Sequence, residues 1–136
     1  MKSERFTEEP GELTEESLDK LLVVNVSAGT NWERIKNNVE AGVFLRFIVT
    51  NDFEIYLAPG SHTHEGMLED NGLEWKNCMI SNGVLRENSG TLLFIYHSAS
   101  RSALHAAVEK KIIGFLKDRS GIDLSSKKIS SIYSTD

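Results

Sequence analysis

Two histidines and a carboxylate stand close together in the segment His62-Thr63-His64-Glu65. Imidazole nitrogens and carboxylates are zinc ligands when they converge on one point. Residues two apart on a helix diverge by about 200°, so His62 and His64 converge only in an extended segment or at the first turn of a helix. The zinc-protease spacing, with histidines four apart, does not occur here. We therefore predict a surface turn without a cofactor, and a metal site at His62 and His64 is the alternative.

A second group of polar residues, 97–102, joins an apolar predicted strand to a long predicted helix. Backbone amides at a helix start, with hydroxyls and a guanidinium beside them, suit a phosphate or a carboxylate. The glycines and lysine of the Walker phosphate loop are missing from residues 97–102, and this segment contains no cysteine that could act as a nucleophile. Serines are also ordinary helix caps, and we favour that interpretation. An anion site would be formed by His97, Ser98, Ser100, Arg101 and Ser102.

Nucleophilic catalysis is the third chemistry that these residue types suggest. An imidazole titrates near neutrality, so His97 could serve as a general base. A serine hydrolase would pair Ser98 with His97 or His62 and with an acid such as Asp52, but no Gly-x-Ser-x-Gly segment surrounds any serine. His105 projects onto the apolar arc of the long predicted helix, which favours a hydrogen-bonded core histidine. We assign no catalytic residue, and whether the chain is an enzyme stays open.

Length and composition are those of an ordinary globular domain. The 136 residues are 40% hydrophobic and 26% charged, and Cys78 is the single cysteine. One cysteine forms no intrachain disulfide, which suits a reducing compartment. The first residues lack the apolar core of a signal peptide, and the longest apolar runs are too short to cross a bilayer. We therefore expect a cytoplasmic protein without membrane contact.

Charge is distributed unevenly along the chain, whose net charge is −5. Residues 1–20 carry seven acidic against three basic residues, and residues 101–136 carry seven basic against four acidic ones. A nucleic-acid-binding domain usually has a stronger basic excess on one face, so the charge speaks against nucleic acid. A salt-sensitive contact with nucleic acid, kept as a third possibility, would use Arg101, Lys110, Lys111, Lys117 and Lys128.

Alternating apolar residues predict two hairpins. In the first, residues 43–49 and 53–57 flank the loop 50–52, and burial on one face would pair Val49 with Phe53, Phe47 with Ile55, and Leu45 with Leu57. The second joins residues 84–86 to an apolar strand at 92–97 through a turn at 87–90. Residues 129–133 alternate as well and could add an edge strand.

Capping residues predict where the helices begin. Thr14 and Ser61 are plausible N-caps, and Thr30 with Glu33 matches a capping box. A helix over 102–119 has one apolar face. Residues 22–27 could extend the first helix or form a strand.

These elements predict an α+β fold, in which helices, including the long C-terminal one, cover one face of a mainly antiparallel four-stranded sheet. Residues 1–12 are expected to form a flexible acidic arm, and residues 13–136 a single domain. We expect Phe47 and Phe115 to be core residues, each costing about 3–5 kcal/mol when replaced by alanine if buried.

A series of short motifs occurs in residues 43–86. They are Leu45-Arg46-Phe47-Ile48-Val49, Thr50-Asn51-Asp52, Glu54-Ile55-Tyr56, His64 and Gly83-Val84-Leu85-Arg86. This order resembles small uncharacterised accessory proteins of phages and mobile elements. The Trp-Asp that often follows the second strand in those proteins is missing here. The resemblance implies an accessory protein and no particular activity.

The sequence favours a non-enzymatic binding or interaction module that engages a protein partner or a second copy as a homodimer, and the resemblance implies a phage or mobile-element accessory protein. An exposed apolar patch would support this hypothesis. The alternative is a small hydrolase or phosphate-handling enzyme using the 97–102 loop and nearby histidines, which must then meet in one cleft.

Overall fold

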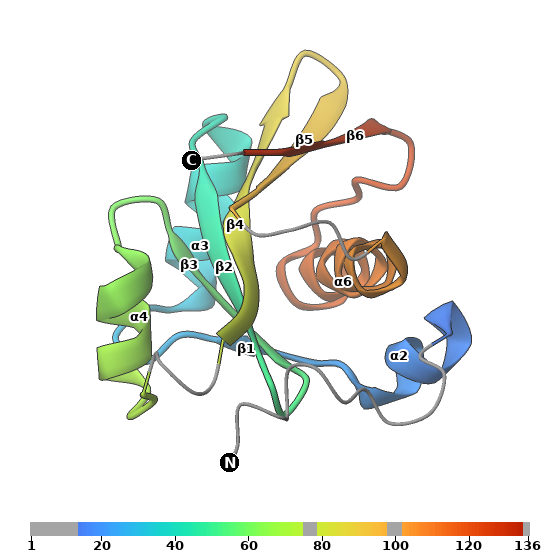
Figure 1. Ribbon diagram of the computed structural model, residues 1–136. Helices are drawn as coiled ribbons and strands as arrows, with labels where there is room; N and C mark the ends of the chain where they lie inside the picture. The colour runs from blue at the N-terminus through green and yellow to red at the C-terminus, as the bar shows by residue number, and fades with distance from the viewer. Residues whose placement is uncertain (1–13, 75–78, 98–101, 135–136) are drawn as a thin grey trace.

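A computed structural model describes residues 14–74, 79–97 and 102–134 of the chain (Figure 1). Among these residues, four α-helices and six strands alternate irregularly along the chain. In order they are α2 (Glu15–Leu21), β1 (Val23–Val26), α3 (Trp32–Glu40), β2 (Leu45–Thr50), β3 (Glu54–Pro59), α4 (His64–Asp70), β4 (Met79–Asn88), β5 (Thr91–Tyr96), α6 (Ser102–Phe115) with its π-helical extension η1 (Leu116–Ser120), and β6 (Lys128–Tyr133). The predicted arm, residues 1–12, lies outside the described residues.

All six strands belong to one mixed sheet with the order β1-β3-β2-β4-β5-β6. The central pairs are antiparallel, and each outer strand, β1 or β6, lies parallel to its neighbour. The predicted four-stranded, mainly antiparallel sheet is therefore wrong, although the α+β class holds. Parallel strands pair only through long crossover connections, which leave no local hairpin signal in the sequence. The open question about residues 22–27 is answered by strand β1.

The first predicted hairpin forms, but its register differs by two residues. Phe47 pairs with Leu57 and Val49 with Ile55, instead of the expected partners Ile55 and Phe53. Phe53 lies in the turn with a positive φ of 62°, and its N–H donates to the Thr50 carbonyl. A shift of two residues keeps each side chain on its face, so the predicted buried face is retained.

Helices cover both faces of the sheet, which corrects the prediction that they lie on one face (Figure 1). Residues of α2, α3 and α6 share the larger hydrophobic core with one face. The α4 residues Met67 and Leu68 pack instead against Ile48 and Ala58 on the other face. The predicted helix pattern recorded which residues are apolar but not which side of the sheet each helix would reach.

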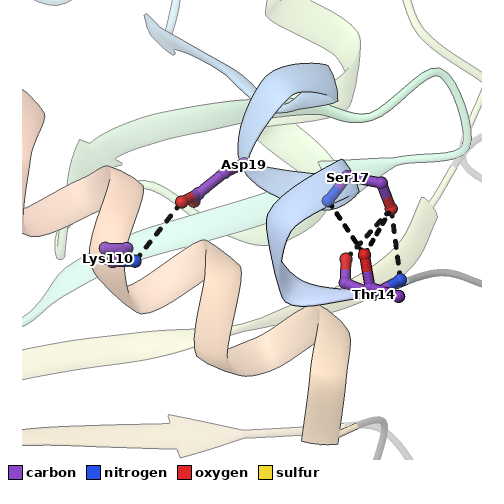
Figure 2. Close-up of polar contacts among 4 residues, drawn as sticks. All are labelled: Thr14, Ser17, Asp19 and Lys110. Atoms are coloured by element: carbon purple, nitrogen blue, oxygen red, sulfur yellow. Dashed lines mark hydrogen bonds and ion pairs between the residues drawn. The ribbon is translucent and has the colours of Figure 1, made fainter.

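Local capping chemistry explains where the helices start. Thr14 is the N-cap of α2, as predicted, and its side chain and that of Ser17 each accept a hydrogen bond from the other's backbone N–H (Figure 2). The other two caps lie slightly further along the chain than predicted, at Asn31 for α3 and Thr63 for α4. Each of these side chains accepts a hydrogen bond from an N–H of the first turn. Within the described ranges, no helix combines the length and apolar character needed to cross a bilayer.

Candidate functional site

The fold brings two of the predicted histidines together. His64 is the first residue of α4, and His97 follows the last residue of β5. Their ring centroids are 5.7 Å apart, and the rings lie edge to face. The short helix on the second face of the sheet therefore meets the end of an inner strand at a histidine pair.

His64 is held in one tautomer by the backbone of β4. Its Nε2 lies 3.1 Å from the carbonyl oxygen of Gly83, and a carbonyl only accepts, so Nε2 carries the proton. Burial lowers the pKa of His64, and electrostatic repulsion from Arg46 and His97 lowers it further, against the opposing effect of the Gly83 hydrogen bond. His64 is therefore a neutral, oriented imidazole at neutral pH, with its Nδ1 lone pair unprotonated.

A neutral imidazole whose other nitrogen donates to a carbonyl is the form that binds metals or accepts protons. The described residues contain no group of three or more His, Cys, Asp and Glu residues that could hold a metal ion. His62 thus does not join His64 and His97 in such a group. Its Nδ1 is buried and lacks a hydrogen-bond partner among the described atoms. The metal site at His62 and His64 has no further support from the geometry.

The predicted anion site is only partly visible. Ser98, Ser100 and Arg101 lie outside the described residues. Ser102 is the first residue of α6, and His97 is exposed at the end of β5. The anion site stays a prediction.

A buried polar network that the sequence did not predict lies on the opposite face of the sheet. His105 Nε2 and Ser81 Oγ are 2.8 Å apart, and His105 Nδ1 lies 3.3 Å from Tyr133 Oη. The His105 ring stacks on Tyr96 with centroids 3.7 Å apart. Ser81 and His105 are each 1% exposed, so no substrate reaches this serine–histidine pair. The contact is structural.

Glu109 of α6 connects this network to the last strand. Its Oε2 accepts hydrogen bonds of 2.6 Å from both Tyr96 Oη and Ser131 Oγ. Burial raises the pKa of Tyr96 far above its ordinary value, and the Glu109 carboxylate raises it further. The tyrosine hydroxyl therefore keeps its proton and donates it. Through these bonds α6 holds β6 in place against β5.

Strand β6 forms one edge of the sheet, and all six of its residues are exposed. Lys128 N–H donates to the Gly90 carbonyl, and Ser134 N–H donates to the Tyr96 carbonyl. Backbone groups alternate in direction along a strand, so the even-numbered residues bind β5. The N–H and C=O groups of Ile129, Ser131 and Tyr133 consequently point away from the sheet.

The side chains of β6 are unusually apolar for an exposed edge. Ile129, Ile132 and Tyr133 are 45%, 48% and 38% exposed, and Lys128 carries the strand's single charge. Natural proteins usually protect such edges with charges, proline, bulges or covering segments. The opposite edge, β1, is shorter, and α6 contacts it. Strand β6 is thus the more open edge among the described strands.

Two features of the sequence predicted parts of the β6 edge and of the buried network beneath it. The alternation of residues 129–133 predicted an added edge strand, and the helical projection placed His105 in the core, where it is found. The sequence did not predict the role of Glu109, because a single glutamate on a helix is ordinarily solvated.

Comparisons with known proteins add no assignment. No protein-family model matches the chain, and searches of curated proteins and of solved structures also return no match.

Proposed function

We propose that this chain is an interaction module that self-associates by pairing β6 with β6 of a second copy. The observation that carries the proposal is the exposed, apolar edge of β6, which the Tyr96–Glu109–Ser131 hydrogen bonds hold in an extended conformation. Strand addition at a sheet edge uses backbone hydrogen bonds for affinity and alternate side chains for specificity. An edge that is already held in place loses less conformational entropy on pairing.

The geometry of β6 favours one register. A two-fold axis perpendicular to the sheet pairs the strands antiparallel and keeps equivalent faces together. With the axis at Ser131, the three residues whose backbone groups point outward oppose one another, so each exchanges both hydrogen bonds with the other copy. Ile129 of one copy then lies beside Tyr133 of the other on the same face, a cross-strand pair that adds apolar contact.

A second copy is the favoured partner because its strand matches in length and polarity. The two Lys128 side chains lie at opposite ends of the paired strands in this register, so like charges do not meet. Strand pairing alone makes a small interface, for which we expect a dissociation constant of roughly micromolar order. The resemblance to phage and mobile-element accessory proteins stays a prediction beside this proposal, as does a cytoplasmic location.

Sedimentation velocity over a range of concentrations tests the proposal. We expect a monomer–dimer equilibrium for the full chain and a monomer for Ile129→Pro, because proline removes an outward N–H without touching the bonds to β5. Ile129→Thr, which keeps that N–H and a β-branched side chain, is the matched control and should still dimerise, though more weakly. A wild-type protein that stays monomeric at every concentration contradicts the proposal.

One observation favours a second candidate, the small hydrolase or phosphate-handling enzyme. The segment containing His64 lies beside His97, as that hypothesis requires. Assays with p-nitrophenyl phosphate and p-nitrophenyl acetate test it. Activity that His64→Gln and His97→Ala both abolish would support this candidate, and activity indistinguishable from buffer would exclude these substrates.

A further inference from the structure

A groove of about 490 Å³ lies between β1 with the end of α2 on one side and α6 with η1 on the other. Because β1 and β6 are opposite edges of the sheet, this groove is separate from the β6 edge. Its volume falls in the range of ligand-binding clefts. Figure 2 shows α2 and α6 side by side here, with Asp19 and Lys110 pointing toward each other.

The floor of the groove is apolar. Leu22 is 3% exposed, and Val24 and Phe115 pack against the main core while remaining partly accessible. Gly114 also lines the groove, and a Cβ added there would meet nothing within 4 Å. Glycine inside a helix is unfavourable. At this position it leaves room that any other residue would fill.

The rim of the groove carries more positive than negative groups. Lys110, Lys111 and Arg119 line the groove together with Asp19 and Asp118. Lys110 Nζ is 3.4 Å from Asp19 Oδ2, so this pair neutralises itself. The Arg119 guanidinium lies 5.7 Å from the centroid of the Phe115 ring, which orients the cation over the apolar floor. Lys111 and Arg119 then outweigh Asp118, and the groove favours an acidic ligand.

One acceptor in the groove lacks a partner. Asp19 Oδ1 is buried and makes no hydrogen bond within the part of the chain that the structure describes. An atom with no accessible surface admits no ligand donor, so this oxygen does not contribute to recognition, which rests on the apolar floor and the positively charged groups. A peptide that carries an apolar side chain beside a carboxylate matches both of these features.

We infer that this groove binds an acidic peptide segment of a partner protein. An apolar side chain of the peptide lies on Leu22, Val24 and Phe115, and its carboxylate meets Lys111 and Arg119. The inference does not depend on dimerisation through β6.

NMR titration of the full chain with acetyl-Glu-Phe-Leu-Glu-amide tests the inference, with acetyl-Lys-Phe-Leu-Lys-amide as the charge-reversed probe. We expect the acidic probe to shift the amide signals of Val24, Lys111 and Gly114, and to bind at least about tenfold more tightly than the basic probe. The double variant Lys111→Glu with Arg119→Glu should reverse that preference. Equal binding of the two probes would overturn the assignment of an acidic ligand.

Filling the groove gives an independent test. Gly114→Leu replaces a poor helix former by a good one, so the variant should fold, and its side chain should lower the affinity for the acidic probe by about tenfold or more. The matched control is Ala103→Leu, at an exposed position on the same helix that does not line the groove. Equal affinities of the two variants, or no shift of groove signals by the acidic probe, would overturn the proposal.

Discussion

Tyr96 and Glu109 are joined by a 2.6 Å hydrogen bond from Tyr96 Oη to Glu109 Oε2, which connects the fully buried end of β5 to the middle of α6. The same carboxylate oxygen accepts from Ser131 on β6. A single side chain of α6 therefore links an inner strand to an edge strand. Charge-assisted hydrogen bonds are roughly twice as strong as neutral ones, so Glu109 adds a strong side-chain link from α6 to β6 beside the backbone pairing of β6 with β5.

Replacing Glu109 by alanine should lower the free energy of unfolding by about 1–3 kcal/mol, because the buried Tyr96 hydroxyl loses its acceptor. Urea denaturation measures this loss. Lys110→Ala is the matched control on the same helix, since the exposed Lys110–Asp19 pair should contribute less than about 1 kcal/mol. A Glu109→Ala variant as stable as this control would show that the hydrogen bonds do not hold β6.

The free energy of unfolding should decrease as the pH falls below neutrality, because His64 becomes protonated more readily in the unfolded state. Its pKa in the folded protein is lowered from 6.5, mainly by burial. Above pH 6.5 both states are neutral at this residue and the effect is absent. As the pH falls below 6.5 the unfolded state binds a proton first, so the free energy of unfolding decreases until the folded pKa is passed.

The variant His64→Gln isolates this effect, because its side-chain amide can still donate to the Gly83 carbonyl. Urea unfolding between neutrality and the onset of carboxylate titration should show a shallower pH dependence for the variant than for the wild type. Parallel curves for the two proteins would contradict the lowered pKa.

Gly83 is expected to tolerate no side chain. Its Cβ would overlap the carbonyl oxygen of Ile95 on the neighbouring strand and lie 2.9 Å from Phe47 Cζ. Gly83→Ala should therefore cost at least about 1–3 kcal/mol, measured by thermal unfolding. Gly114→Ala, at a helical glycine whose Cβ meets no neighbour, should instead stabilise by about 0.5–1 kcal/mol. Equal effects of the two substitutions would contradict the packing around Gly83.

Phe47 and Phe115 were both predicted to be core residues, but their replacement by alanine should lower the free energy of unfolding by different amounts. Phe47 is fully buried against Phe94 and Tyr96, so Phe47→Ala should cost about 3–5 kcal/mol. Phe115 is only partly buried beside Trp32, so Phe115→Ala should cost less than that range. Chemical denaturation of both variants measures the difference, and equal losses would show that the groove beside Phe115 is closed in solution.

The hairpins illustrate what the sequence could predict. The alternation around Phe47 and Ile55 correctly identified the buried face of the first hairpin, because side-chain direction follows directly from a period of two. It could not identify the register, because Phe53 adopts a positive φ in the turn, a conformation that bulky residues rarely adopt. The alternation of apolar and polar residues predicts the direction of the side chains, but it does not predict the geometry of the turn that sets the register.

The candidate site was predictable only in part. His105 was correctly expected in the core from its place on the apolar arc. Its partners Ser81 and Tyr133 lie 24 and 28 residues away in sequence, on strands whose pairing no local pattern reveals. The parallel placement of β6 beside β5 depends on the crossover through α6, and the role of Glu109 follows from that placement. The partners of His105 and Glu109 could not be predicted, because they depend on which strands pair across the sheet and not on local residue patterns.

Hydrogen exchange of the β6 amides, followed by NMR, tests the central proposal most directly. It should be measured well below and well above the dimer dissociation constant found by sedimentation. We predict that the outward amides of Ile129, Ser131 and Tyr133 become protected only at high concentration, whereas those of Ser130 and Ile132, which face β5, are protected equally at both. Exchange of the outward amides that does not change with concentration would contradict strand pairing through β6.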